Sequence, residues 1–142
     1  VEENLIAGGY SRPDQNNIKT EIESVYTYFP RLEERKRQVA GYLSGGEQQM
    51  LAVARALARD IKVLLLDEPY EGLAPVIVDE IEKTLHTIKE QGITTVIVEQ
   101  NAVRALELAD RSVILDTGSI VFDGSAQEVL ENEELRAEYL AI

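Results

Sequence analysis

The strongest constraint on the fold is a change in the spacing of apolar residues near position 61. Before it, apolar residues recur every three or four positions, which is the period of amphipathic helices. After it come four short apolar or β-branched runs, at 62–66, 94–98, 112–115 and 120–122. Helical segments at 75–90 and 102–109 separate the first three runs. Strands that alternate with helices indicate an α/β fold, so we expect helices over 1–60 and an α/β layer over 61–142.

Proline and glycine mark the expected ends of the helices. Pro13 and Pro30 bracket a predicted helix over 14–29, because proline can start a helix and interrupts one. Its apolar stripe consists of Ile18, Ile22, Val25 and Phe29. Pro75 starts a later helix and Gly92 ends it. The apolar positions of that helix are Ile77, Ile81, Leu85 and Ile88.

The strands differ in their expected surroundings. Val63-Leu64-Leu65-Leu66 is continuously apolar, which predicts a strand buried on both faces. Thr94 to Val98 is β-branched and predicts a second strand. Asp116-Thr-Gly-Ser119 predicts the tight turn of a β-hairpin, and two short acidic helices are expected to follow it.

Composition narrows the possible functions. Net charge is −12, from 26 acidic and 14 basic residues, so nucleic acid is not an expected partner. No apolar run approaches the roughly 20 residues that a membrane-spanning helix needs. Cysteine is absent, which excludes disulfides and thiolate metal sites. The basic run over 31–37 is interrupted by two glutamates and is either a solvated helix face or a docking surface.

A helix start with unusual chemistry is predicted at Ser44. Ser44 and Glu47 have the spacing of a capping box, and the helix continues to about Arg59. Its buried face is expected to contain Met50, Val53, Ala54 and Leu57. Gly45 and Gly46 each cost roughly 0.5–1 kcal/mol relative to alanine in a helix, but they leave bare amides at the positive end of the helix dipole. This combination favours an anion, and phosphate is the natural ligand.

Two carboxylates follow the first strand directly. Asp67 and Glu68 come at the end of the apolar run, where burial of a charge is costly without a task. Phosphoryl transfer supplies two such tasks, which are holding Mg²⁺ and orienting the attacking water. Solvated acids at the end of an ordinary strand are the alternative interpretation.

Both motifs resemble those of ABC ATPases, and they occur in the order that this family uses. The signature motif is matched by Leu43, Ser44, Gly45, Gly46, Glu47, Gln48 and Gln49. The resemblance implies that residues 43–48 form an ATP-binding site. In it, the Ser44 hydroxyl and a glycine amide hold the γ-phosphate of an ATP bound to the opposite subunit. The strand and its carboxylates resemble the Walker B motif, which implies that Asp67 holds Mg²⁺ and that Glu68 is the general base.

Smaller motifs indicate one branch of this family. Gly72, Leu73 and Ala74 lie at the position of the D-loop and, with Pro75, resemble ATPases of branched-chain amino acid importers.

Gln100 stands where most members have a switch histidine. An amide can donate a hydrogen bond to phosphate but cannot shuttle a proton, which puts any imidazole mechanism in doubt.

Two residues near these motifs have no assigned catalytic role. Tyr70 departs from the family pattern. His86 has charged helix neighbours and is expected to face solvent.

The resemblance covers the latter part of the family fold. We expect a partial P-loop NTPase (ABC ATPase) fold, with a helical signature subdomain at 1–60. The C-terminal part of the mainly parallel, RecA-like core is expected at 61–142. The chain contains no Gly-Lys pair and therefore no Walker A lysine. We expect these 142 residues alone to be inactive and to expose an apolar sheet edge that promotes association.

The resemblance also implies cofactors, partners and location. ATP and Mg²⁺ are the expected cofactors. The expected partners are a second ATPase subunit and transmembrane permease subunits, with a periplasmic or extracellular binding protein acting indirectly. The protein is expected on the cytoplasmic face of the cell membrane. Branched-chain amino acid import is the leading hypothesis; import of urea or amides, a non-transport ABC ATPase and a non-catalytic interaction module are the alternatives.

Overall fold

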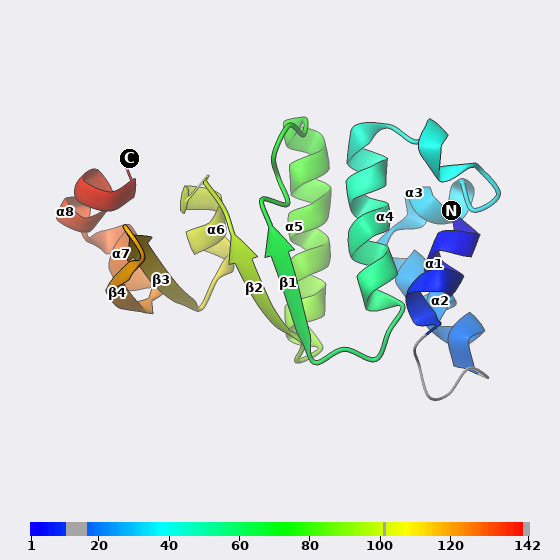
Figure 1. Ribbon diagram of the computed structural model, residues 1–142, viewed down its shortest axis with the longest axis horizontal. Helices are drawn as coiled ribbons and strands as arrows, with labels where there is room; N and C mark the ends of the chain where they lie inside the picture. Colours follow the sequence, from blue (N-terminus) through cyan, green and yellow to red (C-terminus); the bar gives the residue numbers. More distant parts are fainter. Residues whose placement is uncertain (11–16, 101, 141–142) are drawn as a thin grey trace. The chain divides into compact units, whose positions relative to one another are not determined.

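The computed structural model describes residues 1–10, 17–100 and 102–140. The chain divides into two compact units, Val1–Val96 and Ile97–Ile142. Both combine helices with strands, as an α/β fold requires (Figure 1). The predicted subdomain boundary after residue 60 stays a prediction.

The first unit begins with helices. In chain order these are α1 (Glu2–Gly9), α2 (Ile18–Tyr28), α3 (Pro30–Glu34), a 3₁₀ turn (Ala40–Tyr42) and α4 (Gly45–Leu57). The predicted break at Pro30 is confirmed, because α2 is capped at Phe29 and Pro30 is the first residue of α3. Pro13 and residues 14–16 of the predicted helix lie outside the described residues. The predicted apolar face of α4 is confirmed, since Met50, Val53, Ala54 and Leu57 are all buried.

Helices α1 and α4 approach each other closely at two glycines. A Cβ added to Gly8 would lie 2.3 Å from the carbonyl oxygen of Arg55. A Cβ added to Gly9 would lie 2.8 Å from Ile18 Cδ1 and 3.1 Å from the carbonyl oxygen of Ala58. The bare backbone of α1 therefore lets this helix pack directly against the backbone of α4.

A strand–helix–strand segment follows α4. It consists of β1 (Val63–Asp67), α5 (Pro75–Glu90) and β2 (Thr94–Val98), with the bounds of α5 and β2 as predicted. β1 and β2 are paired, and their arrows point the same way in Figure 1. α5 ends in a Schellman motif, in which Gly92 has φ 82° and the amide of Ile93 donates to the carbonyl of Ile88.

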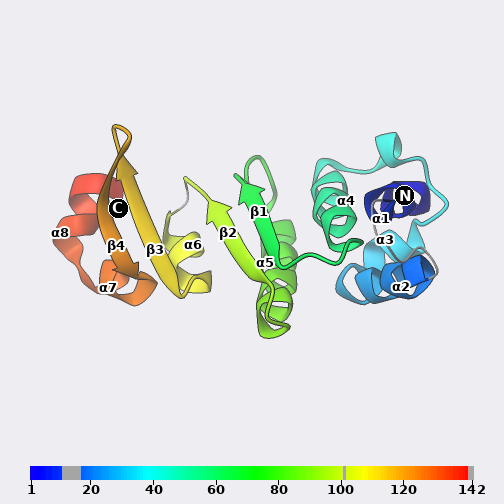
Figure 2. The same ribbon diagram turned by 60° about the horizontal axis from the view of Figure 1, so that its bottom comes forward.

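The expectation that β1 is buried on both faces is wrong. Leu64 is 3% exposed, whereas Val63 is 52% exposed and Leu65 is 72% exposed. Val96 of β2 is also exposed. The reason is that α5 lies beside β1 on one side only (Figures 1 and 2). One face of this sheet therefore exposes apolar side chains, whereas the exposed apolar sheet edge that the sequence predicts stays a prediction.

The second unit is built around a β-hairpin. It contains α6 (Ala102–Leu108), β3 (Arg111–Asp116), β4 (Ser119–Ser125), α7 (Ala126–Glu131), α8 (Glu133–Leu135) and a π-helical turn (Arg136–Leu140). The strands are antiparallel, and the predicted tight turn is confirmed by Thr117 at φ 48° and Gly118 at φ 80°. Positive φ at both central residues is the requirement of a type I′ turn.

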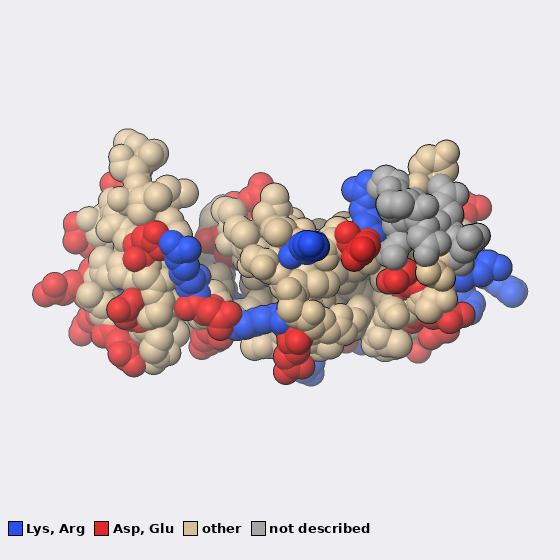
Figure 3. Space-filling model, turned by 90° about the horizontal axis from the view of Figure 1, so that it is seen from below, with Lys and Arg blue, Asp and Glu red and all other residues tan. Residues whose placement is uncertain are grey.

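The core of the second unit is small and its surface is acidic. Leu106, Ile114, Ala126 and Val129 form a buried cluster. Residues 97–142 contain ten aspartates or glutamates against three basic residues. Acidic side chains are spread over this unit on the face shown in Figure 3. Across the described residues, no helix has the length and apolar character to cross a membrane.

The close approach of α1 and α4 predicts an asymmetric response to alanine. We expect Gly8→Ala to lower the free energy of unfolding by about 1–3 kcal/mol, because the added methyl group meets backbone that cannot move aside. Gly41→Ala is the matched control, since an added Cβ there meets nothing within 4 Å. Urea denaturation of both variants checks this, and equal stabilities would show that the α1–α4 contact is loose.

Candidate functional site

The start of α4 is fixed by a reciprocal capping box, as predicted. The Ser44 hydroxyl accepts from the amide of Glu47 at 3.3 Å. Glu47 Oε2 in turn accepts from the Ser44 amide at 2.9 Å and from the Ser44 hydroxyl at 3.0 Å. These bonds satisfy two of the amides that every helix start leaves without an intrahelical partner.

Two amide donors at this helix start remain open. The first-turn amides of Gly45 and Gly46 make no hydrogen bond among the described residues. Ser44 and Gly45 are exposed, and a Cβ added to Gly45 would meet nothing within 4 Å. The tip of α4 therefore presents bare, solvent-facing N–H groups at the positive end of its dipole.

Gly46 has a packing role that the sequence did not reveal. A Cβ at this position would lie 2.7 Å from Cγ2 of Ile77, in the first turn of α5. Gly46 therefore has a packing role beside the predicted phosphate-binding role, which stays a prediction. Gly46 allows the first turns of α4 and α5 to touch.

The two remaining signature side chains differ in exposure. Leu43 is buried and anchors the segment before the helix, whereas Gln48 is exposed. Gln48 Nε2 donates to the carbonyl of Leu43 at 3.1 Å. This bond holds the approach to Ser44 against the first turn of α4.

Glu47 is a buried carboxylate with several partners. Its side chain is 9% exposed and its Oε1 pairs with Arg35 Nε at 2.5 Å. The hydrogen bond from the Ser44 amide holds the pKa of Glu47 below its usual range, and the Ser44 hydroxyl and Arg35 act in the same direction. Glu47 therefore stays ionised to lower pH than an ordinary glutamate.

The carboxylate pair lies at the end of β1, as predicted. Asp67 is the last residue of the strand and is exposed. Glu68 is half-buried and has φ 47°, a left-handed conformation that is uncommon for residues other than glycine. Pro69 and Tyr70, which follow, are buried, so the turn after β1 is anchored on its far side.

The loop over 72–74 leads directly into α5. Gly72 has φ 68°, Leu73 is half-buried and Ala74 is the exposed N-cap of the helix. The amide of Leu73 donates to the carbonyl of Tyr70 at 3.3 Å, and the amide of Ile77 donates to the carbonyl of Ala74 at 2.9 Å. These bonds tie the loop to the turn after β1 and to the first turn of α5.

Most predicted site residues gather at one end of the first unit. The C-terminal end of β1 and the first turns of α4 and α5 lie at the same end of this unit (Figure 1). The contact between Gly46 and Ile77 joins the signature segment to the helix that follows the 72–74 loop. Carboxylates and open amides at one end of a sheet are the groups that phosphoryl chemistry requires.

The remaining predicted residues lie elsewhere or are isolated. Gln100 belongs to the second unit, follows β2, is exposed and donates its backbone amide to Glu99 Oε2 at 3.1 Å. His86 is exposed on α5, as expected.

Arg35 was not singled out by the sequence, because a pairing between a loop after α3 and the first turn of α4 has no periodic signal.

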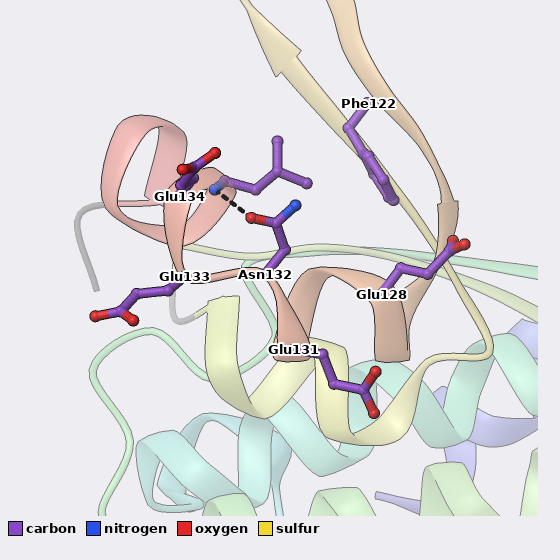
Figure 4. A pocket seen from close by; sticks show the side chains of 7 residues that line it. Phe122, Glu128, Glu131, Asn132, Glu133 and Glu134 are labelled. Atoms are coloured by element: carbon purple, nitrogen blue, oxygen red, sulfur yellow. Dashed lines mark hydrogen bonds between the residues drawn. The ribbon is translucent and has the colours of Figure 1, made fainter.

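An acidic hollow of about 640 Å³ lies in the second unit (Figure 4). It is lined by Phe122, Glu128, Glu131, Asn132, Glu133, Glu134 and Leu135. Asn132 Oδ1 accepts from the Leu135 amide at 3.1 Å and caps α8 (Figure 4). Four glutamates make this hollow unsuited to a triphosphate. Among the described residues, no three or more Asp, Glu, His or Cys side chains are grouped to hold a metal ion.

Comparison with known proteins agrees with the fold and with the motifs. Residues 1–71 match the family model described as ABC transporter. The chain is 46% identical over 140 residues to the high-affinity branched-chain amino acid transport ATP-binding protein BraG of Pseudomonas aeruginosa, covering 99% of this chain and 60% of BraG. It is 43% identical over 138 residues to the probable branched-chain amino acid transport ATP-binding protein LivF of Archaeoglobus fulgidus, covering 94% of this chain and 57% of LivF.

Solved structures of ABC transporter components have a similar fold. CbiO1 of Clostridium perfringens, part of the ABC transporter complex cbiONQ, superposes with a TM-score of 0.75 at 28% identity, over 90% of this chain and 51% of cbiO1. The ADP conformation of MJ1267, an ATP-binding cassette of an ABC transporter, gives 0.74 at 25% identity, over 88% of this chain and 50% of MJ1267. The protein belongs to the ABC transporter family, and the chain spans about 60% of the length of BraG and LivF.

The depressed pKa of Glu47 predicts an acid-sensitive helix start. A carboxyl group whose pKa is lower in the folded state stabilises the fold above its unfolded pKa, which is about 4.3, and loses that contribution as pH falls through the folded value. We expect Glu47→Gln to lower the free energy of unfolding by about 1 kcal/mol or more near neutral pH. The difference from wild type should shrink below about pH 4. Urea denaturation over this pH range checks it, with exposed Glu34→Gln as the control.

The left-handed backbone at Glu68 predicts which of two variants at this position is the more stable. Both Glu68→Gly and Glu68→Ala remove the carboxylate, but only glycine adopts φ 47° without steric cost. We expect the glycine variant to be more stable than the alanine variant by about 1 kcal/mol. The opposite order in chemical denaturation would mean that the backbone relaxes when the side chain is removed.

Proposed function

We propose that this chain is part of an ATP-binding and ATP-hydrolysing subunit of an ABC importer. The observation that supports this most directly is the exposed tip of α4, with open amides at Gly45 and Gly46 beside the Ser44 hydroxyl. A phosphate is the ligand that such a tip binds well. The resemblance to ABC ATPases implies that this phosphate is the γ-phosphate of an ATP bound to a second ATPase subunit.

The residues at the end of β1 fit the hydrolytic part of this proposal. Asp67 offers an exposed oxygen ligand of the kind that Mg²⁺ prefers. Bound Mg²⁺ supplies neutralisation of phosphate charge. Glu68 orients the attacking water and accepts its proton, and the loop over 72–74 contacts the second subunit.

Gln100 has a separate role in this proposal. Its side-chain amide donates a hydrogen bond to phosphate, where most family members use a histidine. A mechanism in this protein therefore depends on Glu68 for proton acceptance and on Gln100 for hydrogen bonding only.

Branched-chain amino acids are the proposed cargo. BraG and LivF are named as branched-chain amino acid transport proteins and are 46% and 43% identical to this chain. The lipopolysaccharide export ATP-binding protein LptB of Haemophilus influenzae is 35% identical over only 69% of the chain. The proposed partners are permease subunits, a second ATPase subunit and, indirectly, a binding protein, with the subunit on the cytoplasmic face of the membrane.

The hydrolytic proposal is tested with the intact protein that contains this chain. We expect Mg²⁺-dependent ATP hydrolysis that falls by about 10²–10⁴-fold in Glu68→Gln, because the general base is lost. Glu71→Gln is the matched control, since it removes the same charge from an exposed position three residues away. The 142 residues alone contain no Gly-Lys pair, and we expect negligible hydrolysis from them.

The outcome also separates the enzyme from a non-catalytic interaction module. An intact protein without ATP hydrolysis, or one whose rate is unchanged by Glu68→Gln, would favour the module.

Uptake of labelled leucine, isoleucine and valine by reconstituted transporter, in competition with urea and short amides, tests the cargo.

A further inference from the structure

The helix tip that faces solvent contains an electrostatic conflict. Glu47 Oε2 lies 3.0 Å from the Ser44 hydroxyl and 2.9 Å from the Ser44 amide. An anion that binds at Ser44 and Gly45 would therefore approach an ionised carboxylate. The two negative charges would repel each other, and the repulsion is screened less because the Glu47 side chain is buried. The Ser44 hydroxyl also has its proton directed toward Glu47 and not toward solvent.

Arg35 is placed to resolve this conflict. It follows α3 as its C-cap, and its Nε lies 2.5 Å from Glu47 Oε1. The two carboxylate oxygens are thus divided, with Oε1 toward Arg35 and Oε2 toward Ser44. The Glu47 side chain is 9% exposed and that of Arg35 is 42% exposed, so a partly exposed cation neutralises a buried carboxylate.

Arg35 stands apart from the other cations of the basic run. Arg31 pairs with Glu80 of α5 at 3.1 Å, and Lys36 lies 3.8 Å from Glu33. Arg37 is exposed and makes no ion pair among the described residues. Of these four residues, Arg35 is the one whose side chain contacts the capping box at the start of α4.

We infer that Arg35 is a positioning residue for nucleotide binding. It neutralises Glu47 and holds its carboxylate, so that the Ser44 hydroxyl and the Gly45 amide donate hydrogen bonds to a phosphate. The inference rests on the proposed function, because it concerns the same helix tip. Arg35 acts through Glu47 and does not touch the phosphate. Neutralising the carboxylate also weakens its hold on the Ser44 proton, which frees the hydroxyl to donate to the ligand.

The inference predicts a change in the KM for ATP and not mainly in kcat. In the intact protein we expect Arg35→Ala to raise KM by roughly threefold to tenfold, as fits a partly exposed ion pair. Arg35→Lys keeps the charge and should recover most of the loss. Arg37→Ala is the matched control, since it removes the same charge two residues away and should leave KM and kcat unchanged.

A double-mutant cycle tests the route through Glu47. In the Glu47→Gln background no carboxylate faces the phosphate, so Arg35→Ala should no longer raise KM. An equal rise in KM in both backgrounds, or equal effects of Arg35→Ala and Arg37→Ala, would overturn the inference. A loss of kcat and thermal stability without a change in KM would show a purely structural ion pair and would overturn it as well.

The failure of this inference is distinguishable from failure of the proposed function. Ser44→Ala removes the hydroxyl that is proposed to meet the phosphate. If Ser44→Ala and Glu68→Gln both abolish hydrolysis while Arg35→Ala matches Arg37→Ala, only the role of Arg35 is wrong. If Ser44→Ala leaves KM and kcat unchanged, the phosphate site at α4 is wrong and the role of Arg35 falls with it.

Discussion

The hydrogen bonds between Ser44 and Glu47 decide where α4 begins, and the geometry of the candidate site depends on that starting point. A start one residue later would make Gly45 the N-cap, so its amide would no longer belong to the first turn of the helix. It would also move Gly46 out of contact with Ile77 and separate the first turns of α4 and α5. The same capping box therefore sets the open amides and the packing that supports them.

Features controlled by local chemistry could be predicted from the sequence. The capping box at Ser44, the bounds of α5 and the hairpin turn at Thr117-Gly118 all follow from a few adjacent residues. Capping side chains, a first-turn proline and left-handed glycines act over one turn of chain, so their signals survive without tertiary information. The placement of Asp67 and Glu68 at a strand end was predictable for the same reason.

Features that depend on contacts between distant segments could not be predicted. The pairing of Arg35 with Glu47 and the contact of Gly46 with Ile77 join elements that are separated in sequence and carry no shared period. The exposure of Val63 and Leu65 was also missed, because an apolar run shows that a strand is fit for burial and not what covers it. The left-handed backbone of Glu68 has no sequence signal, since glutamate rarely adopts it.

Because β1 is exposed on one face, the charge of Asp67 also affects the solubility of the protein. Lys62 and Asp67 flank four consecutive apolar residues of a strand, and flanking charges of this kind act as gatekeepers against self-association. Exchanging Asp67 for an uncharged residue removes one gatekeeper together with the candidate metal ligand. A variant with Asp67 replaced by an uncharged residue is therefore more prone to precipitate during purification than a variant with Glu68 replaced. A low yield of the soluble Asp67 variant would reflect this precipitation and would not measure a loss of catalysis.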